Sequence, residues 1–200
     1  MTGIDQKLAH DYTNAVFVGL GGCGINTISR LRKAGIRGSK TVCISRFKED
    51  LPIKGEDVVN FALLGKKADP ARYLRSKSPV SLEERADAEK CLTEAFKGAK
   101  KVLLFAGLGG FTGTGIARVA AAAAKAEGAR LGMVITYPFK LEKKRRERAD
   151  HVFPALQNLA DDLVLRRNDD LVDLCPEKPM SEAFGMLDSE LAEEIKKGAR

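Results

Sequence analysis

Short apolar runs alternate with longer stretches of helical periodicity along this chain of 200 residues. The apolar runs have the length of buried strands, and glycine follows several of them. We predict strands at 16–20, 41–45, 58–64, 101–106, 131–136 and 163–166, and helices at 26–34, 81–97, 115–127, 141–159 and 180–197. Strands and helices that alternate in this way form a mostly parallel sheet covered by helices on both faces. The sequence therefore predicts an α/β fold, with residues 1–200 as a single domain that ends at the helix 180–197.

Composition and charge narrow the class of protein. With 44% hydrophobic and 30% charged residues, the chain is expected to fold. It has no run of about 20 apolar residues and no apolar core near the N-terminus, so we expect a cytoplasmic protein with no membrane partner. The net charge of +7 gathers at 72–77 and 140–148 without aromatic residues in a base-stacking pattern, which disfavours a nucleic-acid partner.

The cysteines and histidines indicate no metal centre. The four cysteines are far apart in the sequence, no C-x-x-C pair occurs, and only two histidines are present. Neither a zinc site nor a disulfide framework fits this spacing. We expect buried free thiols in a reducing compartment.

A glycine-rich segment, Gly19–Gly24, connects the first strand to the first helix. Glycine lets the backbone approach phosphate oxygens, and the N–H groups at a helix N-terminus face negative charge. The segment also matches G-x-G-x-x-G, the fingerprint of dinucleotide sites. Such a site expects an acid at the end of the second strand, where this chain has Ser45 and Arg46. Arg46 suits a 2′-phosphate, so an NADP-type site is an alternative. A tight turn without a ligand is the structural alternative.

A second glycine-rich segment, Gly107–Gly115, also follows an apolar strand and opens a helix. Two such turns on neighbouring strands can hold one di- or triphosphate from both sides, with threonine hydroxyls as further donors. The lysine-containing motif G-x-x-x-x-G-K-[ST] is absent from the sequence. We expect phosphate contacts from Gly21, Gly22, Cys23, Gly24, Gly109, Gly110, Phe111, Thr112, Gly113 and Thr114.

At this second segment the chain resembles the FtsZ/tubulin family, whose signature GGGTGTG is GGFTGTG at Gly109–Gly115. The resemblance extends from about residue 14 to 198 and implies a Rossmann-like domain that binds GTP or GDP, with Mg²⁺ as a possible cofactor. It places Glu142 and Arg146 near the ribose. It places four residues at the guanine base: Asn26, Asn168, Phe184 and Asp188.

The chemistry of Phe184 and Asp188 supports a base site independently of the resemblance. Residues four apart share one helix face, so an aromatic ring and a carboxylate can stack on guanine and accept from its N1–H and N2–H₂ groups. The alternative places Phe184 in the core and Asp188 in solvent.

Several departures from the family pattern bear on activity. The third phosphate loop of the family is glycine-rich, but the corresponding residues 71–79 contain no glycine. Ser45-Arg46-Phe47 replaces the usual Asn-Thr-Asp, and Phe111 replaces a signature glycine. The loop after the long helix, which carries N-x-D-x-x-D and activates water, is absent, so we assign no catalytic residue.

These departures leave three functional interpretations open. The first is a guanine-nucleotide-binding protein with weak or no hydrolysis alone, which forms a homo-oligomer or regulates a full-length FtsZ-like filament. The second is an NADP-type dinucleotide domain. The third is a degenerate domain that binds no nucleotide and serves only in protein contacts.

Overall fold

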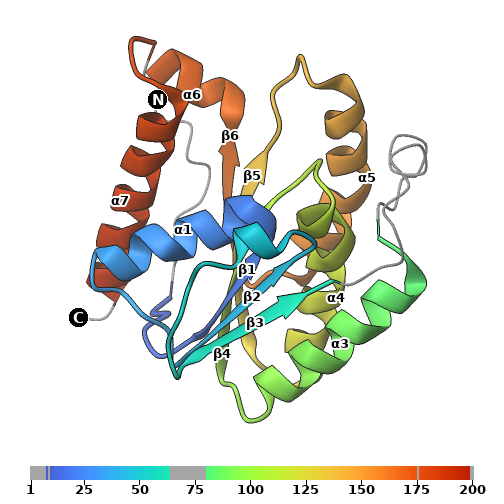
Figure 1. Ribbon diagram of the computed structural model, residues 1–200. Coiled ribbons are helices and arrows are strands. Elements are labelled where there is room, and N and C mark those ends of the chain that lie inside the picture. The colour runs from blue at the N-terminus through green and yellow to red at the C-terminus, as the bar shows by residue number, and fades with distance from the viewer. Residues whose placement is uncertain (1–7, 9, 64–79, 175, 199–200) are drawn as a thin grey trace.

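One parallel sheet forms the centre of the protein (Figure 1). The structure is a computed structural model, which describes residues 8, 10–63, 80–174 and 176–198. Six strands lie in the order β3-β2-β1-β4-β5-β6, and every neighbouring pair is parallel. They are β1 (Val16–Leu20), β2 (Lys40–Ser45), β3 (Val58–Ala62), β4 (Lys101–Gly107), β5 (Arg130–Tyr137) and β6 (Asp162–Arg167). The predicted fold class is confirmed.

Helices cover both faces of the sheet. They are α1 (Gly21–Lys33), α3 (Leu82–Phe96), α4 (Thr112–Ala126), α5 (Lys143–Leu159), α6 (Asn168–Leu174) and α7 (Met180–Gly198), with a 3₁₀ turn η1 (Lys48–Asp50). Helices α3, α4 and α5 pack side by side on one face, and α1 and α7 pack on the other (Figure 1). None of the described helices is long and apolar enough to cross a membrane.

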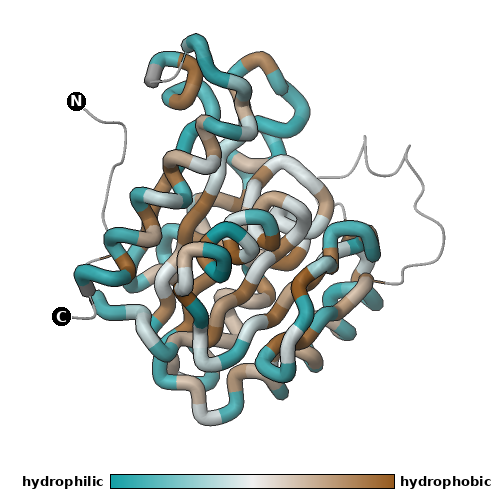
Figure 2. Tube along the Cα trace, turned by 60° about the vertical axis from the view of Figure 1, so that its left-hand side comes forward, coloured by the Kyte–Doolittle hydropathy of each residue, from teal (hydrophilic) through white to brown (hydrophobic). Residues whose placement is uncertain are grey.

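Alternating side chains of the strands feed two separate cores. Val18, Leu104 and Ile135 belong to the core under α3, α4 and α5. Phe17 and Phe105 belong to the core under α1 and α7, where their rings meet edge to face at 5.5 Å. The hydrophobic stretches of the chain lie inside and the hydrophilic ones on the helix surfaces and turns (Figure 2). Successive side chains of a strand point to opposite faces of the sheet, so a sheet between two helix layers needs apolar side chains on both faces.

The strands agree with the prediction to within one or two residues, but two helices begin earlier than predicted. Helix α1 starts at Gly21 instead of Asn26, and α4 starts at Thr112 instead of Gly115. The glycine-rich segments are therefore partly first helical turns. Helix α6 was not predicted. Residues 71–79, which contain no glycine where the third phosphate loop of the family is glycine-rich, lie outside the described part of the chain.

Two glycines let these helices approach the sheet closely. A Cβ on Gly24 of α1 would lie 2.1 Å from the carbonyl oxygen of Phe105 on β4. A Cβ on Gly113 of α4 would lie 2.1 Å from the carbonyl oxygen of Gly107. Any side chain at these positions must push a helix off the sheet, since the opposing atom belongs to the backbone.

We predict that Gly24→Ala lowers the free energy of unfolding by about 1–3 kcal/mol, the usual cost of overpacking. Urea unfolding followed by circular dichroism measures this change. Gly185→Ala on α7 is the matched control, because no atom lies within 4 Å of its added Cβ. It should stabilise the helix by roughly 0.5–1 kcal/mol. Equal stability of Gly24→Ala and the unmodified chain would show that α1 has room to move away from β4.

Candidate functional site

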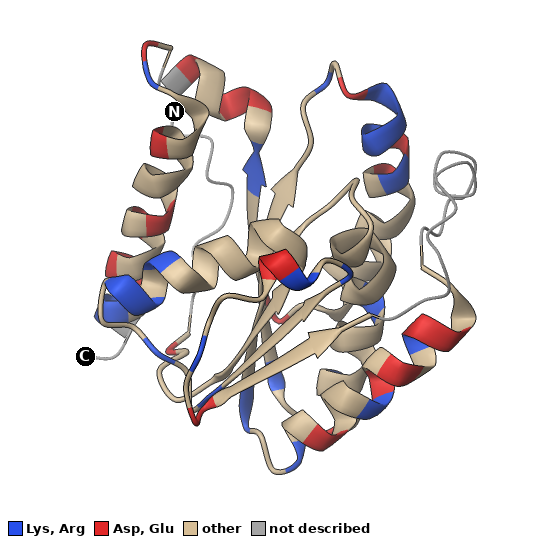
Figure 3. Ribbon diagram, in the orientation of Figure 1, with Lys and Arg blue, Asp and Glu red and all other residues tan. Residues whose placement is uncertain are grey.

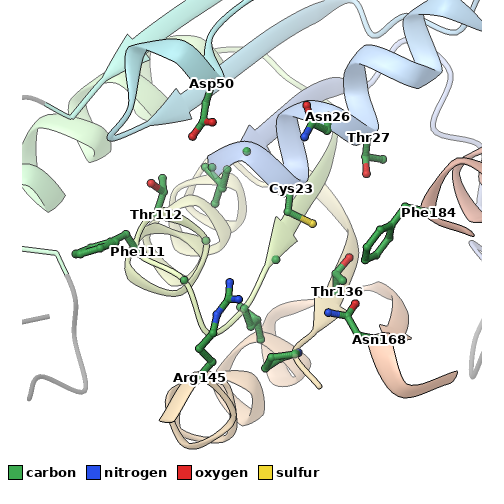
Figure 4. Close-up of a pocket in the computed structure, with 18 of the residues that line it drawn as sticks. Cys23, Asn26, Thr27, Asp50, Phe111, Thr112, Thr136, Arg145, Asn168 and Phe184 are labelled. Carbon is green, nitrogen blue, oxygen red and sulfur yellow. The ribbon is translucent and has the colours of Figure 1, made fainter. Parts of the chain in front are cut away.

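A cavity of about 460 Å³ opens at the carboxyl ends of β1, β4, β5 and β6 (Figure 4). This volume is in the range of small-molecule sites, which in parallel sheets occur at this edge. Its lining residues are Leu20, Gly21, Gly22, Cys23, Asn26, Thr27, Arg30, Phe47, Asp50, Gly107, Leu108, Gly110, Phe111, Thr112, Gly113, Thr136, Pro138, Glu142, Arg145, Arg166, Asn168 and Phe184. Both glycine-rich segments and most of the predicted base contacts meet here.

The first glycine-rich segment forms the N-terminal turn of α1. Gly21, Gly22 and Cys23 line the cavity, and Gly21 has the left-handed backbone angle φ +67° that glycine tolerates. Gly24 does not line the cavity, because it packs on β4 as described above. The first N–H groups of a helix lack intrahelical acceptors, and such groups at a helix N-terminus favour an anion.

The second segment forms the N-terminal turn of α4. Gly110, Phe111, Thr112 and Gly113 line the cavity. Thr114 is 3% exposed, and its hydroxyl accepts a hydrogen bond of 2.8 Å from the N–H of Gly109. Thr114 thus fixes the bend at Gly109, where φ is +87°, and neither residue lines the cavity.

The side chains around Thr112 and Phe111 restrict what this turn can offer to a ligand. The Thr112 hydroxyl accepts a 3.3 Å hydrogen bond from the backbone N–H of Arg46, so its own proton is available to donate. The guanidinium of Arg46 lies 4.7 Å from the centre of the Phe111 ring. The ring points away from Phe184 (Figure 4), so Phe111 contributes its backbone to the cavity.

Polar and aromatic groups line the opposite end of the cavity. Asn26 and Thr27 come from α1, Thr136 from the end of β5, Asn168 from the start of α6 and Phe184 from α7. The Phe184 ring faces Thr136 and Asn168 across the cavity (Figure 4). The buried Oδ1 of Asn168 has no hydrogen-bond partner among the described residues. A buried amide oxygen that is left unpaired at a cavity wall can accept a hydrogen bond from a ligand or from water.

Asp188 lies behind this wall and is not one of the lining residues. It is 3% exposed, and its carboxylate accepts from the Thr27 hydroxyl at 3.2 Å, from Arg30 at 2.9 Å and from Arg166 at 2.7 Å. Arg30 and Arg166 both reach the cavity. The sequence prediction did not include either arginine.

Of the two predicted ribose contacts, one lines the cavity and the other does not. Glu142 lines the cavity, and its carboxylate accepts from the backbone N–H of Phe139 at 3.1 Å. Arg146 turns away, donates to the Pro138 carbonyl at 3.1 Å and Asp169 at 3.2 Å, and lies over the Tyr137 ring. Arg145 points into the cavity instead (Figure 4). The sequence alone did not show whether Arg145 or Arg146 points into the cavity.

Asp50 and Cys23 add chemistry near the glycine-rich turns. The Asp50 carboxylate accepts a 2.6 Å hydrogen bond from Ser45 and would lie 3.1 Å from a Cβ on Gly22. The Cys23 thiol is open to the cavity, and desolvation by the surrounding protein raises its pKa. No group of three or more potential metal ligands from His, Cys, Asp and Glu occurs in the described part of the chain.

Comparison with known proteins identifies the family of the chain. Residues 14–176 match the family model described as "Tubulin/FtsZ family, GTPase domain". The chain belongs to the tubulin/FtsZ family. Its sequence is 38% identical over 183 residues to the cell division protein FtsZ 2 of Methanocaldococcus jannaschii, covering 90% of this chain and 47% of that protein. It is 36% identical to FtsZ 2 of Haloferax volcanii, covering 90% of this chain and 45% of that one.

Solved structures of the tubulin/FtsZ family have the same fold. An empty FtsZ dimer from M. jannaschii superposes with a TM-score of 0.71 at 32% identity, covering 90% of this chain and 53% of that one. CetZ from Methanosaeta thermophila has a TM-score of 0.70 at 16% identity, covering 92% and 54%, and shows the fold alone. The chain spans about half the length of the relatives it matches.

The pattern N-x-D-x-x-D, which the family carries in the loop after the long helix, does occur once in this chain, at Asn168–Asp173. These residues form α6, which directly follows β6. Asp169 accepts from the side chain of Arg146 and the backbone N–H of Lys140. The match is therefore part of the cavity's own wall and not a loop after α7.

We predict that Cys23 is alkylated by iodoacetamide in the native protein much faster than Cys43, which is fully buried. Because desolvation raises the pKa of Cys23 above its ordinary 9.0, its labelling rate should still increase above pH 9. Mass spectrometry of the labelled peptides measures both rates. Cys23→Ala is the control for assignment, and equal labelling of Cys43 would contradict an open cavity at Cys23.

Proposed function

We propose that this chain binds one guanine nucleotide, GTP or GDP, in the cavity. The observation that carries the proposal is the convergence of two glycine-rich helix N-termini on a cavity whose other end holds an aromatic ring and an unsatisfied amide. Two helix dipoles and several free N–H groups suit a di- or triphosphate. The Phe184 ring suits a stacked base.

The residues present fit such a ligand along its whole length. Gly21, Gly22 and Cys23 would donate backbone N–H groups from one side, and Gly110, Thr112 and Gly113 from the other. The ribose would lie between Pro138 and Glu142. In this arrangement Arg145, which lines the cavity, would take the place near the sugar that the resemblance gave to Arg146.

The carboxylate of Asp50 would allow a magnesium ion to bind at the phosphate end of the cavity. Mg²⁺ commonly takes one or two protein carboxylates and completes its shell with phosphate oxygens and water. Asp50 is the carboxylate next to the first glycine-rich turn. It would hold the ion against the terminal phosphates, and the ion would neutralise the repulsion between the carboxylate and the phosphate charge.

The NADP-type alternative loses its main support, which was Arg46. That side chain forms an ion pair with Glu84, which is 3% exposed, and lies over the Phe111 ring. Burial alone would raise the pKa of Glu84, but hydrogen bonds from Ser81 and Arg46 lower it overall, so the pair is charged at neutral pH. The guanidinium of Arg46 thus already has partners within the protein and is not directed at a 2′-phosphate.

We further propose that hydrolysis by this chain alone is weak and that the cavity face contacts another protein. No described side chain in the cavity is placed as a base for an attacking water, apart from acids that already hold other groups. Phe47 at the cavity and Leu141 beside Glu142 are 52% and 92% exposed. An exposed apolar side chain at the cavity, with a second one next to Glu142 in the sequence, favours a protein partner, either a second copy or an FtsZ-like filament subunit.

Replacing Phe184 with alanine should weaken GDP and GTP binding about 10- to 100-fold, because base stacking on an aromatic side chain contributes about 1–3 kcal/mol. Calorimetric titration of nucleotide-free protein with GTP, GDP, ATP and NADPH measures this effect. Met186→Ala, on the exposed side of the same helix, is the control and should bind normally. NADPH binding without GDP binding would support the dinucleotide alternative, and no binding at all would support the degenerate one.

A further inference from the structure

A buried charged cluster forms the wall of the cavity beneath Phe184. Arg166 and Asp188 are 6% and 3% exposed, and Arg166 donates to Asp188 Oδ1 at 2.7 Å and to the Leu187 carbonyl at 2.6 Å. Arg30 donates to the other carboxylate oxygen at 2.9 Å. Two guanidinium groups and one carboxylate leave this cluster with a net positive charge.

The carboxylate of Asp188 has little capacity left for a ligand. An ionised carboxylate offers about four acceptor positions, two on each oxygen. Thr27 and Arg166 occupy both positions on Oδ1, and Arg30 occupies one on Oδ2. A guanine base that donates N1–H and N2–H₂ to the two oxygens would need Oδ1 to lose a partner. Losing either partner leaves a buried polar group unpaired, which is costly.

Of the pair formed by Arg166 and Asp188, it is Arg166 that reaches the cavity. It lines the cavity, whereas Asp188 does not. Two of its five N–H groups donate within the protein, and a guanidinium has no acceptor. It comes from the carboxyl end of β6, where Figure 3 shows positive charge next to the acidic residues of α6.

We infer that Arg166 is a specificity-determining residue that donates to the O6 carbonyl of the base, while Asp188 holds the guanidinium in place from behind. The inference rests on the proposed guanine-nucleotide site and deepens it. The ligand class becomes 6-oxopurine nucleotides, which share O6, and the 2-amino group of guanine contributes little. Adenine is rejected, because its 6-amino group would direct N–H bonds at a guanidinium.

Titration of the full chain with GDP, IDP, XDP and ADP tests this assignment by calorimetry. In the unmodified chain IDP should bind within about threefold of GDP, and XDP, whose base is largely anionic at neutral pH, at least as tightly as GDP. ADP should bind about 10- to 100-fold more weakly, as expected for a lost hydrogen bond to a charged group. Arg166→Met removes the donor and frees Asp188 Oδ1. In this variant GDP should bind at least tenfold more tightly than IDP, and XDP should bind worst, because its 2-oxo group would face the carboxylate.

Arg167→Met is the matched control. It makes the same chemical change one residue along β6, where the side chain points to the opposite face and pairs with Asp170. It should keep the nucleotide ratios of the unmodified chain. Circular dichroism checks that both variants fold, and the ratios in the unmodified chain decide the matter even where Arg166→Met does not fold.

The possible outcomes distinguish a failure of the inference alone from a failure of the proposed function. Preference of the unmodified chain for GDP over IDP by tenfold or more would overturn the role of Arg166 and leave guanine binding intact. An unchanged GDP to IDP ratio in folded Arg166→Met would do the same, because Arg166 would then be only structural. Failure of the unmodified chain to bind GDP, IDP and XDP would overturn the proposed function together with the inference.

Discussion

The site depends on the change of direction between β1 and β4. These strands are hydrogen-bonded neighbours at the centre of the sheet, yet the chain leaves β1 into α1 on one face and leaves β4 into α4 on the other. Side chains cannot fill the crevice between two connections that diverge, and ligands bind there in open α/β sheets. Because Gly24 and Gly113 allow close contact with the backbone of β4, both helix N-termini lie low enough to face the same cavity.

The strands and the overall layering could be predicted from the sequence because they follow from simple periodicity. Runs such as 101–106 have the apolar content and length of a strand between two helix layers, so sequence and structure agree there. The helix starts could not be placed as well, because glycine disfavours helix and yet Gly22 and Gly24 lie in the first turn of α1. Helix α6 has only seven residues and several acids, and gives no periodic signal.

The candidate site could be located from the sequence more easily than its side chains could be oriented. Gly110, Asn168 and Phe184 line the cavity as expected, while Arg146 and Asp188 are held by other protein groups. Successive residues of a helix are rotated by about 100°, so neighbouring arginines point to different surroundings. Which of them faces the cavity depends on where the helix starts. One signal for Arg166 was available: an arginine at the end of a buried strand requires a buried acid nearby.

The buried pair of Arg166 and Asp188 is difficult to explain by stability alone. Desolvating two charges costs about as much as their attraction returns, so an apolar pair of similar volume would hold β6 against α7 at least as well. The cost is understandable if one of the charges acts on a ligand, because a guanidinium fixed by a carboxylate and a carbonyl loses little freedom when a base arrives. The same pairing accounts for the position of Asp188 behind the wall, one helical turn after Phe184, which lines the cavity. In the proposed site, a carboxylate that fixes its neighbour in this way would influence base recognition without touching the base.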